Sequence, residues 1–150
     1  FPISNNAVEI NKKMTFDVMS EIKERFQKKI LGKRVLLLGV SYKEDTSDTR
    51  YSPAERVFSF FKKMRCNISF YDPVVHYWDY AKNYSIKNSF LNNFDIYVYL
   101  VNHKSFKKLK IKYKNKSLIL DLNHVLEKKR RLEILKSKKF KSFFIGSKQR

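Results

Sequence analysis

The chain has 150 residues, and 33 basic against 14 acidic side chains give it a formal net charge of +19. This length suits one compact domain, and no apolar run reaches the roughly 20 uncharged residues that a bilayer span needs. The single cysteine, Cys66, excludes an internal disulfide and a zinc site of several thiolates; we expect no metal and a reducing compartment, the cytoplasm.

The chain opens with the pattern of a long amphipathic helix between residues 5 and 30. Its apolar residues recur at steps of three and four, as Ala7, Ile10, Met14, Val18, Ile22 and Phe26. Gly32 stands where a helix stop is expected. The apolar run at residues 34–40 then predicts a strand buried on both faces, as in a parallel sheet.

A polar loop at residues 41–51 leads to a strong helix start. Ser52 is a capping residue, Pro53 suits the first helical position, and Glu55 completes a capping box with Ser52. A second strand at residues 67–71 is stopped by Asp72 and Pro73. Residues 34–73 therefore predict the strand, helix and strand of a right-handed crossover unit.

The same alternation continues to the end of the chain. We predict a short helix at 86–92, a strand at 94–101, a helical turn at 104–109, a strand at 117–121, a basic helix at 125–135 and a last strand at 140–145. The pattern predicts an α/β fold with a doubly wound, mostly parallel sheet. This is a Rossmann-like arrangement of three α/β/α layers, preceded by the long amino-terminal helix.

The loop from Val40 to Ser52 is the first candidate site, because ligands of parallel sheets bind at the carboxyl ends of strands. Lys43 and Arg50 in this loop, with the free N–H groups of the helix that follows, favour a diphosphate. The common dinucleotide fingerprint needs three glycines and only Gly39 is present, so NAD binding by that route is disfavoured. A self-neutralising surface network of charges stays open as an alternative.

Residues 39–53 read Gly-Val-Ser-Tyr-Lys-Glu-Asp-Thr-Ser-Asp-Thr-Arg-Tyr-Ser-Pro. This string resembles the signature of the carboxyl-terminal domain of UDP-glucose and GDP-mannose dehydrogenases, which has an aromatic-lysine pair, then Asp-x-Arg and Ser-Pro. Further matches follow in the family's order at residues 71–73, 102–106, 121–126 and 144–146. Residues 49–53 and 76–78 are closer to the surface-polysaccharide branch, which oxidises UDP-N-acetylhexosamines or UDP-glucose.

The resemblance implies a division of the chain and roles for single residues. Residues 1–31 correspond to the end of the central linker and dimerisation helix, and residues 32–150 to the nucleotide-sugar-binding domain. Tyr42 and Lys43 then contact the UDP-sugar, and Arg50 lies close to the NAD that the other half binds.

The family's reaction is an NAD-dependent oxidation of the C6 alcohol of the sugar, through a thiohemiacetal on a cysteine that precedes this segment. We therefore expect no catalytic residue here, no cofactor for this chain alone, and no oxidation by the chain without the NAD-binding half. In the full enzyme, the resemblance implies a homodimer through the first helix.

Four residues qualify this interpretation. Asn123 replaces an arginine that the family usually has, so a cation near the ligand is lost. Cys66 matches no family motif and is predicted to be a buried structural thiol. His103 and His124 follow predicted strand ends, and we expect structural roles for both.

Two other functions stay open. Lysines alternate with aromatic residues at 106–113 and 138–144, as in a basic nucleic-acid-binding module. The loss of an arginine at Asn123 instead suits a degenerate remnant that keeps the fold without the ligand.

Overall fold

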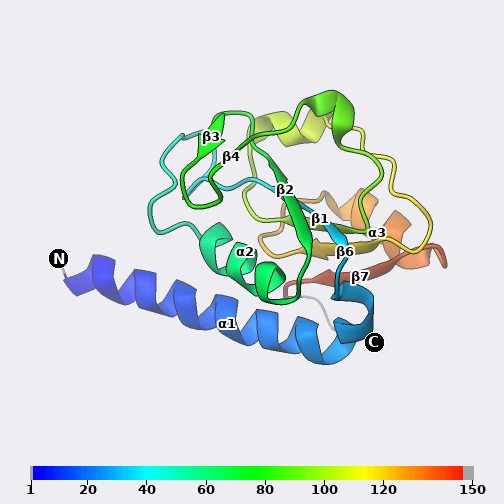
Figure 1. The fold of residues 1–150 in the computed structure, drawn as a ribbon, viewed down its shortest axis with the longest axis horizontal. Coiled ribbons are helices and arrows are strands. Elements are labelled where there is room, and N and C mark those ends of the chain that lie inside the picture. The colour runs from blue at the N-terminus through cyan, green and yellow to red at the C-terminus, as the bar shows by residue number, and fades with distance from the viewer. Residues whose placement is uncertain (1, 147–150) are drawn as a thin grey trace.

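The computed structural model describes the backbone of residues 2–146 and the side chains of residues 15–146. Figure 1 shows a twisted sheet with the long helix α1 and the shorter α2 running side by side along one flank. The helices are α1 (Pro2–Ile30), α2 (Ala54–Lys63) and α3 (Lys128–Lys136), with short 3-10 helices η1 (Asn88–Phe90) and η2 (Lys104–Lys108). Among the described residues, no helix is both long enough and apolar enough to cross a membrane.

Five parallel strands form the main sheet in the order β2-β1-β5-β6-β7. They are β1 (Arg34–Leu38), β2 (Asn67–Tyr71), β5 (Ile96–Tyr99), β6 (Leu118–Asp121) and β7 (Lys141–Phe144). The order reverses between β1 and β5, which makes the carboxyl ends of these two strands a topological switch point. The doubly wound parallel sheet is thereby confirmed.

The sheet separates two apolar clusters, because successive side chains of a strand point to opposite faces. Val35 and Leu37 pack with residues of α1 and α2, whereas Leu36 and Leu38 pack with Phe106 and other residues of the opposite face. These four β1 side chains are fully buried, and Arg34, the first residue of the strand, is exposed. Burial on both faces confirms the three-layer arrangement that the apolar run predicted.

The helices differ from the sequence-based expectation at their ends. α1 begins at Pro2 rather than residue 5, and the predicted stripe is confirmed at Ile22 and Phe26, which are buried. Its members Ala7, Ile10 and Met14 lie outside the described side chains. α3 begins at Lys128 rather than residue 125, because the Asp121 carboxylate accepts backbone N–H groups in the preceding turn.

The segment after β2 differs most from the expectation. The predicted helix at 86–92 is reduced to the single 3-10 turn η1. An unpredicted hairpin, β3 (Tyr77–Trp78) with β4 (Asn83–Tyr84), precedes it. Trp78 is almost fully buried against the rings of Phe58 and Phe70. Two-residue strands have too few positions for a recognisable alternation, so the hairpin depends on this tertiary contact.

Gly39 allows the chain to leave β1 beside the end of β5. Its φ is +88°, and an added Cβ would lie 2.6 Å from the Cβ and 2.9 Å from the backbone nitrogen of Val101. A side chain at this position therefore meets both backbone strain and a steric clash. Gly32, with φ +71°, has nothing within 4 Å of its added Cβ and meets the strain alone.

We predict that Gly39→Ala lowers the free energy of unfolding by about 3 kcal/mol, and that Gly32→Ala lowers it by only about 1 kcal/mol. Urea denaturation of the two variants and the wild type measures both values. Equal losses would show that the close approach to Val101 contributes nothing.

Candidate functional site

The predicted site residues all lie in the loop between β1 and α2, which leaves β1 at the switch point. Tyr42, Lys43 and Arg50 are exposed there. The loop is folded back on itself, because the backbone N–H of Tyr42 donates to the carbonyl of Asp48 over 2.7 Å. The structure thus presents the three side chains on one short closed loop at the carboxyl edge of the sheet.

Arg50 and Asp48 form a bidentate ion pair at the end of this loop. Nε of Arg50 lies 3.0 Å from Oδ1 of Asp48, and a terminal nitrogen lies 2.9 Å from Oδ2. These hydrogen bonds lower the pKa of Asp48 to about 2 and raise the pKa of Arg50. Arg50 is therefore partly neutralised, as the surface-network alternative predicts, although its side chain is 82% exposed.

Lys43 is the cation of the loop that has no acidic partner among the described residues. Its side chain is exposed, and no ion pair involves it within the part of the chain that the structure describes. The backbone N–H groups of residues 43, 44, 46 and 47 likewise have no hydrogen-bond acceptor among the described residues. These groups and Lys43 are free to meet a phosphate or a sugar hydroxyl.

The start of α2 is less open to an anion than its sequence predicts. Oγ of Ser52 accepts the N–H of Ala54 over 3.1 Å, and the carbonyl of Ser52 accepts the N–H of Glu55 over 3.2 Å. Oγ of Ser52 does not accept the N–H of Glu55, and the N–H of Ser52 donates to the carbonyl of Thr49 and not to the Glu55 side chain, so the predicted capping box is not formed. The expectation of free N–H groups at the start of α2 is therefore wrong for two of them, because Ser52 accepts the N–H groups of Ala54 and Glu55. What remains for a ligand is mainly the helix dipole.

Beneath the loop lies a buried carboxylate that sequence reasoning missed. Asp72, the first residue after β2, is 2% exposed. Its two oxygens accept from the nitrogens of Val40 (2.9 Å), Ser41 (3.3 Å), Val74 (2.9 Å), Val75 (2.9 Å) and His103 (3.1 Å). Burial raises the pKa of this carboxyl, but the hydrogen bonds from His103 and the backbone outweigh it, and the pKa falls below its ordinary value.

His103 joins this carboxylate to the loop above it. The ring is fully buried; Nε2 faces Asp72, and Nδ1 lies 3.0 Å from the backbone nitrogen of Asp45. Oγ of Ser41 lies 3.3 Å from Nε2 and donates to the carbonyl of Lys43 over 2.8 Å. We call Ser41, Asp45, Asp72 and His103 the Asp72–His103 cluster; it confirms the structural role expected of His103.

A second buried aspartate organises the loop after β6. The carboxylate of Asp121 accepts the N–H groups of Asn123, Val125 and Leu126 over 2.8 to 3.2 Å. The side-chain amide of Asn123 donates to the carbonyl of Leu100 over 3.0 Å. Asn123 therefore links the ends of β5 and β6 and supplies no charge.

The remaining candidates lie apart from the loop. His124 is exposed, and an added Cβ on Gly146 would lie 3.1 Å from its ring, so it borders the end of the chain that the structure describes. Cys66 precedes β2, at the amino edge of the sheet, and its Sγ donates to the carbonyl of Ile30. It is half-buried rather than fully buried as predicted, and burial raises the pKa of its thiol. No cluster of metal-binding side chains occurs among the described residues.

A groove of about 850 Å³ runs between α1 and α2. Tyr51, Ser52 and Pro53 line one part of it, and residues such as Phe16 and Lys63 line the rest; neither Tyr42 nor Lys43 is among them. The groove therefore lies next to the end of the β1–α2 loop, and Lys43 does not line it.

We predict that Asp72→Asn lowers the free energy of unfolding at neutral pH by about 3 kcal/mol, because an amide NH₂ in place of one oxygen meets buried donors. The exposed Asp79→Asn is the control and should change little. The lowered pKa of Asp72 means that its ionised form stabilises the fold above about pH 4, the unfolded value, and that this contribution is lost as pH falls through the folded value.

The difference between wild type and Asp72→Asn should therefore shrink below about pH 4 in urea titrations. A difference that stays constant down to acid pH would contradict the assigned ionisation.

The comparisons with known proteins agree with this geometry. The model of the UDP-glucose/GDP-mannose dehydrogenase family, UDP binding domain, matches residues 36–128. A UDP-N-acetyl-D-mannosamine dehydrogenase of Methanococcus vannielii is 36% identical over 137 residues, which are 83% of this chain and 31% of that protein. Its counterpart in Methanocaldococcus jannaschii is 32% identical over 93% of this chain and 33% of that protein.

Solved structures share the fold. An NDP-N-acetyl-D-galactosaminuronic acid dehydrogenase from Methanosarcina mazei has a TM-score of 0.70 at 22% identity, over 94% of this chain and 30% of that one. A UDP-glucose dehydrogenase from Pyrobaculum islandicum has a TM-score of 0.65 at 18% identity, over 93% and 32%. The chain thus spans about a third of the relatives it matches. It belongs to the UDP-glucose/GDP-mannose dehydrogenase family and contains the family's UDP-binding domain.

Proposed function

We propose that this chain binds the UDP-sugar substrate of an NAD-dependent nucleotide-sugar 6-dehydrogenase. The observation that carries the proposal is the family match over residues 36–128, which includes the β1–α2 loop at the switch point of the sheet. Ligands of open α/β sheets bind at such a point. The open cation and the free backbone N–H groups of the loop suit a diphosphate.

Within this proposal, Tyr42 and Lys43 contact the nucleotide sugar and Arg50 faces the NAD held by the other half of the enzyme. The exposed phenol ring of Tyr42 offers a stacking and hydrogen-bonding surface. Lys43 supplies a positive charge that no described acid neutralises. Arg50 is held by Asp48 at the other end of the same loop, and its guanidinium can bind a phosphate of the cofactor while it stays paired with Asp48.

This chain's own β1–α2 loop does not fit a dinucleotide in the Rossmann manner. The common motif uses three glycines to bring the backbone against the pyrophosphate, whereas this loop has Gly39 alone and closes on itself between Ser41 and Ser52. We therefore assign NAD to residues outside this chain, and the oxidation of the C6 alcohol to a carboxylate as well.

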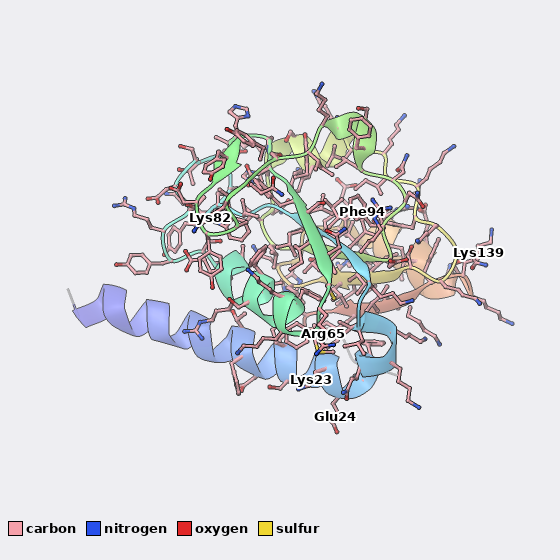
Figure 2. All side chains as sticks on the ribbon, in the orientation of Figure 1. Lys23, Glu24, Arg65, Lys82, Phe94 and Lys139 are labelled. Carbon is pink, nitrogen blue, oxygen red and sulfur yellow. The ribbon has the colours of Figure 1, made fainter. Side chains whose placement is uncertain are left out.

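The UDP-N-acetyl-D-mannosamine dehydrogenases among the relatives favour a UDP-N-acetylhexosamine over UDP-glucose. A uronic acid made from such a sugar is a building block for surface polysaccharide, formed in the cytoplasm in our proposal. The alternative of a nucleic-acid-binding module has weaker support than the family match, and the labelled lysines Lys23, Lys82 and Lys139 lie on separate parts of the molecule in Figure 2.

We also propose that residues 1–31 form a dimerisation helix that is distinct from the binding domain at 32–150. Figure 1 shows the amino-terminal end of α1 extending past the rest of the chain. Phe16 on this helix is 66% exposed beside the groove. Light scattering on the chain measures its oligomeric state, and a monomer at all concentrations would contradict this part of the proposal.

We predict that UDP-N-acetyl-D-mannosamine, UDP-N-acetylglucosamine and UDP-glucose bind the chain with micromolar-range affinity at best and that NAD is not reduced. Lys43→Ala should weaken the binding of all three about tenfold, or about 1.4 kcal/mol, because it removes the open charge. Isothermal titration calorimetry measures these affinities.

Lys139→Ala is the matched control, since Lys139 is equally exposed but lies beside β7 at the amino edge of the sheet. It should bind like the wild type. The proposal fails if a folded sample gives no heat with any of the three UDP-sugars, or if both lysine variants lose affinity equally.

A further inference from the structure

We propose that His103 is a positioning residue for the UDP-sugar site, whose neutral ring with the proton on Nε2 holds the loop segment that presents Tyr42 and Lys43. This inference deepens the proposed function and rests on it where ligand affinity is concerned. The tautomer itself and its effect on the loop are testable without any ligand.

The hydrogen bonds assign the tautomer. A backbone N–H can only donate, so the Asp45 N–H, 3.0 Å from Nδ1 of His103, requires a lone pair on that nitrogen. The single proton of the neutral ring is therefore on Nε2. It faces the Asp72 carboxylate at 3.1 Å and the Ser41 oxygen at 3.3 Å.

This ring controls the chain on both sides of Lys43. Before it, Ser41 contacts Nε2 and donates to the Lys43 carbonyl over 2.8 Å. After it, the N–H of Asp45 is fixed on Nδ1. The backbone of Lys43 is thus held at two points by groups that converge on one buried imidazole, while its side chain extends into solvent.

A second proton on His103 is incompatible with this arrangement. An Nδ1–H would point at the Asp45 N–H, two donors facing each other. Oδ1 of Asp45 lies 3.8 Å from Nδ1, beyond hydrogen-bond distance, and it accepts the backbone N–H of Lys104 over 3.3 Å. For this oxygen to accept an Nδ1–H, the carboxylate must move closer and the Asp45 N–H must leave Nδ1, so the loop around Lys43 must move.

The ring of His103 is surrounded by two carboxylates and one aromatic ring. Among the described residues, the charged side chains facing it are Asp72, from the end of β2, and Asp45, from the β1–α2 loop. The third neighbour, Phe106 of η2, is apolar, with its ring centroid 5.2 Å from that of His103. The hydrogen bonds that hold the loop around Lys43 are therefore those of the neutral ring of His103.

The first test compares His103→Gln and His103→Ala with the wild type in calorimetric titrations with UDP-N-acetylglucosamine at neutral pH. Glutamine can donate its NH₂ to Asp72 and accept the Asp45 N–H with its carbonyl, so it can keep both contacts of the neutral ring, whereas alanine keeps neither.

His103→Gln should bind within about threefold of the wild type, and His103→Ala should bind about tenfold or more weakly. His76→Gln, which removes an exposed histidine before the β3–β4 hairpin, should bind like the wild type. A His103→Ala affinity equal to that of the wild type, or a His103→Gln affinity as weak as that of His103→Ala, would overturn the proposal.

The second test needs no ligand and separates this inference from the proposed function. Two-bond ¹⁵N–¹H NMR spectra of the histidine rings should show His103 with the proton on Nε2 alone, and the Asp45 amide proton should exchange slowly at neutral pH. In His103→Ala, which removes the acceptor, that amide should exchange faster; if this variant does not fold, His103→Gln should keep the slow exchange. A proton on Nδ1, or an unprotected Asp45 amide in the wild type, contradicts the inference even if UDP-sugars bind, whereas absent binding with the expected spectra contradicts the proposed function alone.

Discussion

The buried carboxylate of Asp72 is the interaction on which the carboxyl edge of the sheet depends. An ionised group taken out of water is destabilising unless hydrogen bonds satisfy both its oxygens. Here the donors come from three separate segments: the turn after β1, the turn after β2 and the histidine after β5. The hydrogen bonds that stabilise the ionised Asp72 therefore also fix the segments after β1, β2 and β5 relative to one another.

This arrangement allows the candidate site to be exposed and ordered at once. Loops rich in charge are ordinarily mobile because few buried contacts hold them. In this chain the groups that hold the loop, Ser41 and Ser52, are buried, and the groups available to a ligand stand outside. Binding energy then need not be used to order the loop, which is the advantage of a preorganised site.

The sequence predicted β1, β5 and β6 well because each is an apolar run buried on both faces, and that pattern needs no knowledge of partners. It predicted the exposed loop residues through their fixed spacing. It did not predict the Asp72–His103 cluster, whose hydrogen-bonded pairs are 31 to 62 residues apart in the sequence and are brought together by the sheet. The usable signal was a polar residue soon after each of three buried strands: Ser41, Asp72 and His103. The late start of α3 was missed for a similar reason, since the competing acceptor, Asp121, belongs to the preceding strand.

The attraction of a diphosphate must come from the β1–α2 loop, because Asn123 carries no charge. Its short amide is used on the carbonyl of Leu100, so it stiffens the ends of β5 and β6 and offers a ligand no charge. Arg50 is already paired with Asp48, so its partly neutralised charge attracts a phosphate less strongly than an unpaired cation would. Lys43 has no such competitor among the described residues, and the direct attraction of a diphosphate therefore falls mainly on this one side chain. If binding depends on Lys43 alone, it also depends on the position of the Lys43 backbone. The Asp72–His103 cluster fixes that position, so the exposed charge and the buried cluster act together.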